Sequence, residues 1–261
     1  KRVPKDFIED YEIPLPSVEE QKRIVKILDE AFEKIEKAKE NTEKNLKNSK
    51  ELFESYLQSV FANPGEGWEE RNINEVCLLK SGFTIPKKIE KTSGDVLYVK
   101  VGDMNFLGNS ISIQSSSRFV NLSDINKNQI IPEGSVIFPK RGGAIFTNKR
   151  RKIVKPTIVD LNTMALVPSE LINADLLYYW FLRIDLRDLN SGSSIPQINN
   201  YSFDEVYIPY PVALSEQKII VKKLDSLSEQ TKKLEEIYKQ KLADLEELKK
   251  SILNKAFSGG L

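Results

Sequence analysis

The sequence predicts an α+β protein in which one mixed α/β domain is flanked by two long helices that pair as an antiparallel coiled coil. Three observations support this fold class: a helical segment that occurs near both ends, short strand-like runs between its two copies, and a single apolar helix among those runs. The 261 residues are 40% hydrophobic and 30% charged, which is enough apolar material for one domain core with accessory helices.

The two helical segments are copies of one another. Glu20-Gln21-Lys22 recurs as Glu216-Gln217-Lys218, and the match continues without a gap to Phe61 and Phe257. In each copy, successive apolar residues lie alternately four and three positions apart, as in helices that pair along a narrow seam. Because one folded domain separates the copies, an antiparallel pair is the simpler closure. The residues predicted to pair are Ile24, Leu28, Ile35, Leu46, Ile220, Leu224, Leu234 and Leu242.

The ends of both helices are marked by local signals. Ser17 and Ser215 are the predicted N-caps, and the prolines just upstream prevent either helix from extending toward the N-terminus. Asn63-Pro64-Gly65 and Gly259-Gly260 are the predicted stops.

The segment between the helices has a different sequence pattern, with short apolar runs separated by turn residues. Strand-like runs occur at residues 96–101, 130–138, 153–159 and 163–167, with turn signals such as Pro132-Glu133-Gly134 between them. One helix is predicted over residues 174–189, with Asn173 as its N-cap, and its aromatic residues are interpreted as core.

Basic residues are concentrated in one part of this segment. Residues 134–159 hold no acidic side chain, a glycine pair that permits close backbone approach, and an asparagine that can hydrogen-bond to base edges. Such a run is often a solvated edge, but Lys and Arg dominate DNA affinity, and the combination favours nucleic-acid contact. The predicted contact residues are Lys140, Arg141, Gly142, Gly143, Asn148, Lys149, Arg150, Arg151, Lys152 and Lys155.

A second candidate follows the predicted helix. Small polar residues there offer hydroxyl groups and backbone N–H groups to a phosphate, although an ordinary helix-to-strand loop has a similar composition. These candidates are Ser191, Gly192, Ser193, Ser194, Gln197 and Asn199.

No catalytic or metal site is predicted. Histidine is absent, Cys77 is the single cysteine, and no glycine-rich phosphate loop is present. The formal net charge of +1 excludes a globally basic nucleic-acid binder but not a locally basic one. The lone cysteine and the lack of a long apolar run predict a cytoplasmic protein without a membrane segment.

An ordered set of motifs resembles the specificity subunit of type I restriction–modification systems. Each motif is moderately specific, whereas their order over nearly the whole chain is highly specific. In chain order they are Ile13-Pro14-Leu15-Pro16 before Glu20-Gln21-Lys22, Gly67-Trp68, Asn190 with Gly192-Ser193 and Pro196, Ile208-Pro209 before Glu216, and Lys255-Ala256-Phe257-Ser258-Gly259.

The resemblance implies a non-catalytic subunit in which a target-recognition domain reads one half of a bipartite DNA target. In that family the paired helices hold two such domains apart and dock the modification subunits. Methyl transfer belongs to the modification subunits, which bind S-adenosylmethionine, and cleavage belongs to a restriction subunit. We therefore expect double-stranded DNA and these subunits as partners, and no cofactor on this chain.

The resemblance also predicts a domain division. Residues 1–16 would be the tail of a preceding target-recognition domain, 17–63 a conserved spacer helix, 64–211 a target-recognition domain and 212–261 a second spacer helix. This order predicts the C-terminal half of a two-domain subunit, with a natural half-size subunit that dimerises as the alternative, and a truncated chain could self-associate through its exposed helices. The alternatives are the specificity portion of a fused restriction–methyltransferase enzyme and a coiled-coil scaffold without DNA readout.

Overall fold

A computed structural model of the chain describes residues 15–192 and 194–261. Two compact units make up this structure. The helical unit consists of the described residues up to Glu54 together with Leu227–Leu261, and the mixed unit is Ser55–Ser226. Most of the predicted N-terminal tail (residues 1–14) and Ser193 of the polar loop lie outside the described residues.

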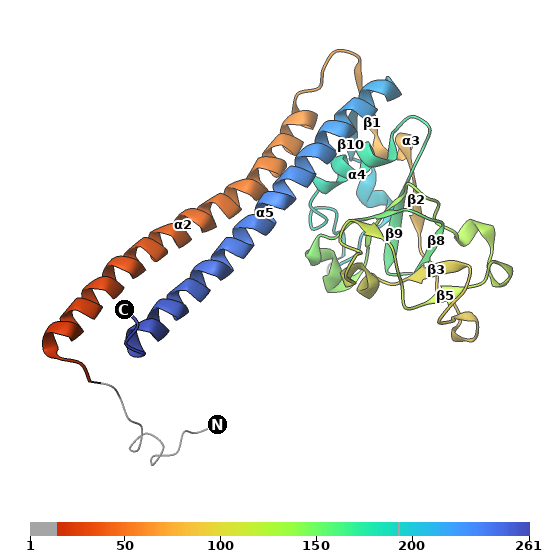
Figure 1. Cartoon of the computed structure of the whole chain (residues 1–261). Helices are drawn as coiled ribbons and strands as arrows, with labels where there is room; N and C mark the ends of the chain where they lie inside the picture. Colours follow the sequence, from red (N-terminus) through yellow and green to blue (C-terminus); the bar gives the residue numbers. More distant parts are fainter. Residues whose placement is uncertain (1–14, 193) are drawn as a thin grey trace. The chain divides into compact units, whose positions relative to one another are not determined.

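The helical unit contains the larger parts of α2 (Val18–Ala62) and α5 (Leu214–Phe257), which run antiparallel (Figure 1). Lys39 near the middle of α2 forms an ion pair of 2.8 Å with Glu246. Closer to the start of α2, the Arg23 guanidinium donates to the Leu261 carbonyl at 2.7 Å. The beginning of α2 therefore lies beside the end of α5, and the predicted antiparallel pair is confirmed.

The seam of this pair differs in part from the prediction. Of the predicted residues in the helical unit, Ile35 is buried and four others are half-buried, whereas Leu234 is 38% exposed. The buried Thr231 is followed by the half-buried Glu235 and Tyr238, so a regular seam passes beside Leu234. The prediction for Leu234 was therefore wrong. The four half-buried residues are Ile24, Leu28, Leu46 and Leu242.

Among its described residues, the mixed unit contains ten short strands and two short α-helices, besides several 3-10 turns and the adjoining ends of α2 and α5. They are β1 (Trp68–Asn72), α3 (Ile73–Val76), β2 (Cys77–Ser81), β3 (Val96–Val99), β4 (Ser112–Ile113), β5 (Phe119–Val120), β6 (Val136–Pro139), β7 (Arg151–Ile153), β8 (Thr157–Val159), β9 (Thr163–Pro168), α4 (Ala174–Leu182) and β10 (Tyr207–Pro211). The strands form a five-stranded sheet of order β2-β9-β6-β7-β4, a three-stranded sheet of order β5-β3-β8, and the pair β1-β10. The predicted α+β class is confirmed.

The core lies between these sheets and is built from β-branched and other aliphatic side chains. Val99 and Val159 of the three-stranded sheet share one buried cluster with Ile113, Ile137 and Ala165 of the five-stranded sheet, and all five are 0% exposed. A strand that is buried on both faces has a continuous apolar sequence. Val136–Pro139 is such a strand, and its residues therefore do not alternate between apolar and polar.

The run at residues 153–159, predicted as one strand, is two strands in different sheets. β7 ends at Ile153 in the five-stranded sheet, and β8 begins at Thr157 in the three-stranded one. Pro156 lies between them and has no N–H to donate to a ladder. The chain changes sheets there, and Thr157 forms a bridge with Ile131.

Helix ends depart from the prediction at two places. Asn173 caps α4 as predicted, because its Oδ1 accepts from two backbone N–H groups of the first turn. However, α4 ends at Leu182 rather than at residue 189, since Arg183 and Ile184 donate three residues back and tighten the last turn. α5 begins at Leu214, one residue before the predicted cap Ser215.

Ser17 behaves as predicted at the start of α2. Its Oγ accepts from the Glu20 N–H at 3.3 Å. The stops also agree: α2 ends just before Asn63, and Gly259 adopts a φ of +75° after α5. Gly260 then donates to the Lys255 carbonyl at 2.8 Å, which satisfies a carbonyl at the helix end.

Candidate functional site

One edge of the five-stranded sheet gathers the loops that carry the predicted contact residues. β6 is antiparallel to both β7 and β9, with Pro139 opposite Thr163, and β2 is antiparallel to β9, with Ser81 opposite Met164. β4 is parallel to β7 and starts beside it. The segments after β2 and β6 and before β4, β7 and β9 therefore meet at this edge, which we call the loop edge.

Two predicted segments far apart in the sequence are joined there. Arg141 and Gln197 form an isolated antiparallel bridge. Gly142 N–H donates to the Pro196 carbonyl at 2.8 Å, and Ile198 N–H donates to the Lys140 carbonyl at 2.9 Å. The basic run and the small polar loop are thus one continuous surface.

The polar loop is closed by its own hydrogen bonds. Asn190 Oδ1 accepts from the N–H groups of Gly192 at 3.1 Å and Gln197 at 2.8 Å. A Cβ on Gly192 would lie 2.1 Å from the Ile195 carbonyl oxygen, so only glycine fits this turn. Asn199 donates from its side chain to Ser191 Oγ and to the Tyr201 hydroxyl. The described residues of the loop are consequently tied to one another by hydrogen bonds.

The exposed cation that the basic run places at the loop edge is Arg141, at the beginning of the run. Arg141 is exposed, whereas Lys140 is half-buried and donates to Ser81 Oγ at 2.9 Å. Burial, together with the neighbouring Arg141, lowers the pKa of Lys140. Gly142 has a φ of +73°, and nothing lies within 4 Å of a Cβ placed on Gly142 or Gly143. Both glycines therefore leave the backbone open to a close approach.

The later part of the run turns inward, and this corrects the prediction. Arg150 is 3% exposed, and its guanidinium lies 5.0 Å from the centre of the Phe181 ring. Burial lowers the pKa of Arg150 to about 10. Asn148 adopts a left-handed φ of +54°, and its Oδ1 accepts from the Leu186 N–H at 2.9 Å. The Arg150 side chain is therefore not presented to a ligand, whereas Asn148 is exposed although its Oδ1 is engaged within the protein.

Arg151 and Lys152 are also engaged with the protein. Arg151 donates to the Met104 carbonyl at 2.9 Å, and Lys152 forms a 2.7 Å ion pair with Asp175 of α4. The number of basic residues in a segment does not show which way their side chains point. Here the start of β7 packs against α4, so these side chains point into the protein. Lys149 is half-buried and donates to the side chain of Asn105.

Lys155 belongs to another part of the unit. It follows the far end of β7, opposite the loop edge, and lines a hollow with Leu78 and Val167. The structure thus separates it from the other predicted contact residues.

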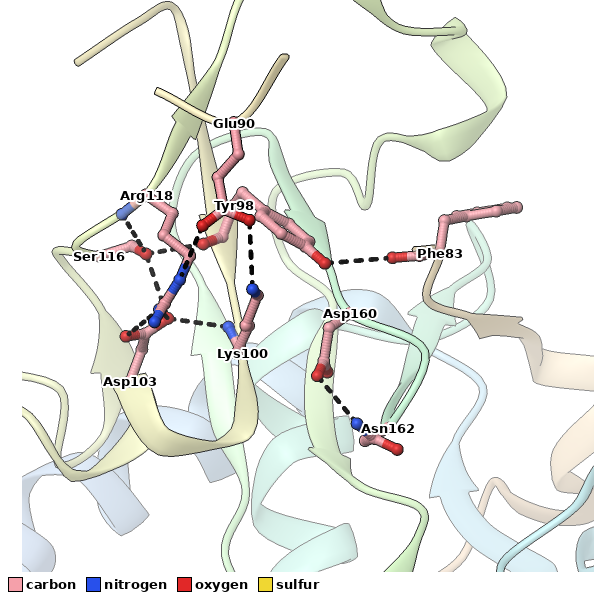
Figure 2. Close-up of polar contacts among 9 residues, drawn as sticks. All are labelled: Phe83, Glu90, Tyr98, Lys100, Asp103, Ser116, Arg118, Asp160 and Asn162. Carbon is pink, nitrogen blue, oxygen red and sulfur yellow. Dashed lines mark hydrogen bonds and ion pairs between the residues drawn. The ribbon is translucent and has the colours of Figure 1, made fainter. Parts of the chain in front are cut away.

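A charged network behind the loop edge was missed by the sequence analysis (Figure 2). Asp103 is 2% exposed and accepts from Lys100 N–H at 2.8 Å, Ser116 Oγ at 3.1 Å and the Arg118 guanidinium at 3.3 Å. Glu90 joins Lys100 and Arg118 through ion pairs of 3.2 Å. These residues are scattered in the sequence, and no motif signals them.

The start of α5 is attached to the rest of the mixed unit by residues of the repeated motif. Gln217 is 0% exposed; its amide donates to the carbonyls of Leu171 and Pro211 at 2.9 and 2.8 Å and accepts from Asn173 N–H at 2.6 Å. Tyr179 of α4 donates to Asp225. The repeat thus supplies a docking element for the domain.

Within residues 15–192 and 194–261, no cluster of three or more His, Cys, Asp or Glu side chains is placed to hold a metal ion. None of the helices in these residues is both long and apolar enough to cross a membrane.

The family follows from a comparison with known proteins. The model of the type I restriction modification DNA specificity domain matches residues 1–46 and 65–246. The chain belongs to this family.

Similar proteins agree with this assignment. The MjaVIII specificity subunit of Methanocaldococcus jannaschii is 28% identical over 280 residues, which cover 98% of this chain and 64% of that protein. The StySPI specificity subunit of Salmonella potsdam is 28% identical over 203 residues, covering 75% of this chain and 44% of the relative. The chain thus spans less than two thirds of the length of these relatives.

Solved structures share the fold. A chain from a study of complex assembly and conformational transition in the type I R-M system has a TM-score of 0.82 at 23% identity, covering 99% of this chain and 64% of that one. The HsdS subunit from Thermoanaerobacter tengcongensis has a TM-score of 0.65 at 24% identity, covering 95% of this chain and 60% of that one.

Proposed function

We propose that this DNA specificity domain reads one half of a bipartite double-stranded DNA target through the loop edge of its five-stranded sheet. The observation that carries the proposal is the joining of Arg141 and Gly142 to the loop at Pro196 and Gln197 in a family of DNA specificity domains. Arg141 would neutralise a phosphate, and Gln197 would supply an amide group that discriminates between base edges. Asn199 would position Gln197, because its Oδ1 accepts from Gln197 Nε2 at 2.7 Å.

The loop edge has the physical features of a reader. Its backbone is held by hydrogen bonds such as Ile198 N–H to Lys140 O, so little conformational entropy is lost on binding. The open backbone at Gly142 and Gly143 admits a close approach of a phosphate, although Gly142 N–H itself is engaged with the Pro196 carbonyl. Each of these features acts on DNA without any catalytic group.

In this proposal the chain itself is not catalytic. Modification subunits would bind S-adenosylmethionine and transfer the methyl group, and a restriction subunit would cleave, all in the cytoplasm. The paired α2 and α5 would act as a spacer and as a platform for the modification subunits. The chain needs no cofactor of its own for this role.

The repeat supports a second docking site on the helical unit. Gln217 and Asp225 attach the start of α5 to Asn173 and Tyr179 of the mixed unit. Their counterparts in the first copy of the repeat are Gln21, which is only half-buried, and Asp29, which is exposed. Phe257 is 71% exposed, whereas its counterpart Phe61 is 3% exposed. We propose that the exposed set receives a second recognition domain or, if that domain is missing, another copy of this chain.

The test is methylome sequencing of a host that carries the complete system, with and without the gene for this chain. The proposal expects a bipartite methylated motif that disappears when the gene is deleted and returns with the wild-type gene. Replacing residues 140–143 and 190–199 by those of another family member should change one half of the motif and leave the other half and the spacing unchanged. A scaffold without DNA readout predicts no change of motif, and that result would refute the proposal.

A further inference from the structure

We propose that Leu107, supported by Phe106, is an apolar contact that enters a groove of the target DNA and packs on apolar base surface. Leu107 is 103% exposed and Phe106 is 39% exposed. A single exposed leucine is ordinary on a protein surface and would carry no inference alone. The loop that bears Leu107 is also stiffened by a buried asparagine, anchored by a charged network and placed at the loop edge.

The loop is stiffened by the hydrogen bonds of one buried side chain, that of Asn109. Asn109 is 0% exposed and its amide nitrogen donates to the carbonyls of Asp103 and Ser115, both at 2.8 Å. Its Oδ1 accepts from Gln114 N–H at 2.9 Å and from Ser115 N–H at 3.2 Å. A buried amide with all these bonds satisfied holds one loop conformation. Leu107 is therefore displayed on a fixed turn.

The charged network anchors the base of this turn (Figure 2). Asp103 accepts from Lys100, Ser116 and Arg118, while its own carbonyl oxygen accepts from Phe106 N–H at 3.1 Å and from the Asn109 side chain. The next turn closes with Asn109 N–H donating to the Phe106 carbonyl at 2.9 Å. Gly108 adopts a φ of +94°, which allows the chain to reverse immediately after Leu107.

The location of the loop favours DNA as the partner. It precedes β4, and its exit is fixed at the loop edge by Lys152 N–H donating to the Ile111 carbonyl at 2.8 Å. Lys149 donates to Asn105, and Arg151 donates to the Met104 carbonyl at 2.9 Å. An apolar tip with the Lys149 cation beside it matches a groove in which phosphates flank the apolar parts of bases.

Two apolar features of DNA share this chemistry. One is the thymine methyl group in the major groove, and the other is the face of a base at a partly unstacked step, into which Leu and Phe insert as wedges. A preordered loop suits both because no ordering entropy is lost when it binds.

This inference rests on the proposed function, so the test uses the wild-type chain assembled with its modification subunits on the half-site found by methylome sequencing. Leu107→Ala is compared with Leu122→Ala, which removes another exposed leucine (54%) from the three-residue helix η3 (Leu122–Asp124) after β5. Each base pair of the half-site is substituted in turn, and affinity is measured at several salt concentrations.

We expect Leu107→Ala to lower affinity roughly tenfold and to abolish discrimination at one or two adjacent base pairs, as for loss of one base contact. The salt dependence should not change, because leucine carries no charge. Leu122→Ala should match the wild type. Both variants should unfold like the wild type, since each changes an exposed side chain.

Two base substitutions in the DNA distinguish a thymine methyl group from an unstacked base step as the surface that Leu107 contacts. If the contact is a thymine methyl, uracil at that position weakens the wild type as much as Leu107→Ala does. If it is a base step, uracil has no effect, and 2-aminopurine placed there brightens with the wild type but not with Leu107→Ala.

Three outcomes would overturn the inference while leaving the proposed function intact: an unchanged discrimination profile in Leu107→Ala, a loss spread evenly over all positions, or weakened assembly with the modification subunits at unchanged DNA readout. A wild-type complex that shows no sequence preference would instead refute the proposed function.

Discussion

Arg141 and Gln197 lie side by side as an isolated antiparallel bridge that joins the segment after β6 to the loop that follows α4. This relationship makes one surface from two segments that the sequence presents separately. Arg141 faces outward there, whereas Arg150 of the same basic run is buried against Phe181.

Arg141 is the outward cation whose loss should weaken DNA binding most directly. Arg141→Ala should lower the affinity of the assembled complex roughly tenfold and reduce the salt slope by about 0.9, as expected for one lost phosphate contact. Equilibrium binding from low to moderate salt measures both quantities. The matched control is Lys155→Ala, at the opposite end of β7, which should leave affinity and slope unchanged. Equal effects of the two variants would remove the loop edge from the binding surface.

Arg150 should matter for stability rather than for DNA binding. Nε and Nη2 of this buried guanidinium lack a hydrogen-bond partner among the described residues. Arg150→Met should therefore keep the free energy of unfolding within about 1 kcal/mol, because an apolar chain removes an imperfectly paired buried charge. Arg150→Ala should lose roughly 2 kcal/mol or more, because it leaves a cavity beside Phe181. Denaturant unfolding measures the difference, and a loss of DNA affinity in the Met variant would show that Arg150 reaches the DNA.

Gly192 should be irreplaceable in the polar loop. Its Cβ position lies 2.1 Å from the Ile195 carbonyl oxygen, so Gly192→Ala forces the loop to shift, at a cost of about 1–3 kcal/mol. We expect reduced stability together with loss of discrimination in the half-site. Gly102→Ala is the control, since nothing lies within 4 Å of its Cβ position and the residue has no part in the proposed binding surface. If both variants keep stability and discrimination, the loop does not need this turn.

Gln217 and Gln21 offer a comparison within one repeat. Gln217→Ala removes the partners of Asn173 N–H and of two carbonyls, and each buried group left unpaired costs about 1–3 kcal/mol. Gln21→Ala removes a bond to the Pro16 carbonyl on a half-buried side chain and should cost less than about 0.5 kcal/mol. Thermal and denaturant unfolding of both variants should rank them in this order, and the reverse order would contradict the docking role of Gln217.

Cys77 should make stability fall at alkaline pH. Burial raises the pKa of its thiol from 9.0 to about 12, so the unfolded chain loses this proton at lower pH than the folded one. The contribution is complete below pH 9 and is lost as pH rises toward 12. Unfolding free energies of the wild type and Cys77→Ala, measured between pH 8 and 10.5, should therefore converge as pH rises. A constant difference would mean that the thiol titrates normally in the fold.

Local patterns were sufficient for much of the architecture. The repeated motif predicted both long helices and their antiparallel pairing, and Ser17 and Asn173 were assigned correctly as caps because capping depends on neighbouring residues. Strand-like runs were located, but the run at residues 153–159 was not divided. Its two halves enter different sheets, which depends on partners distant in the sequence.

The site was only partly predictable for a related reason. Arg141 and Gln197 were both proposed, yet their adjacency arises from strand order and could not be read from spacing. Arg150 was proposed because of its charge, although the backbone direction at the start of β7 sends its side chain onto Phe181. Leu107 carried no motif at all.

By itself the sequence determined the duplicated helices, the α+β class and the family, because periodicity, capping and ordered motifs are local properties of the chain. Only the tertiary structure decided which charges face outward. The direction of a side chain depends on which strand pairs with which, and that pairing is set by the burial of the whole core.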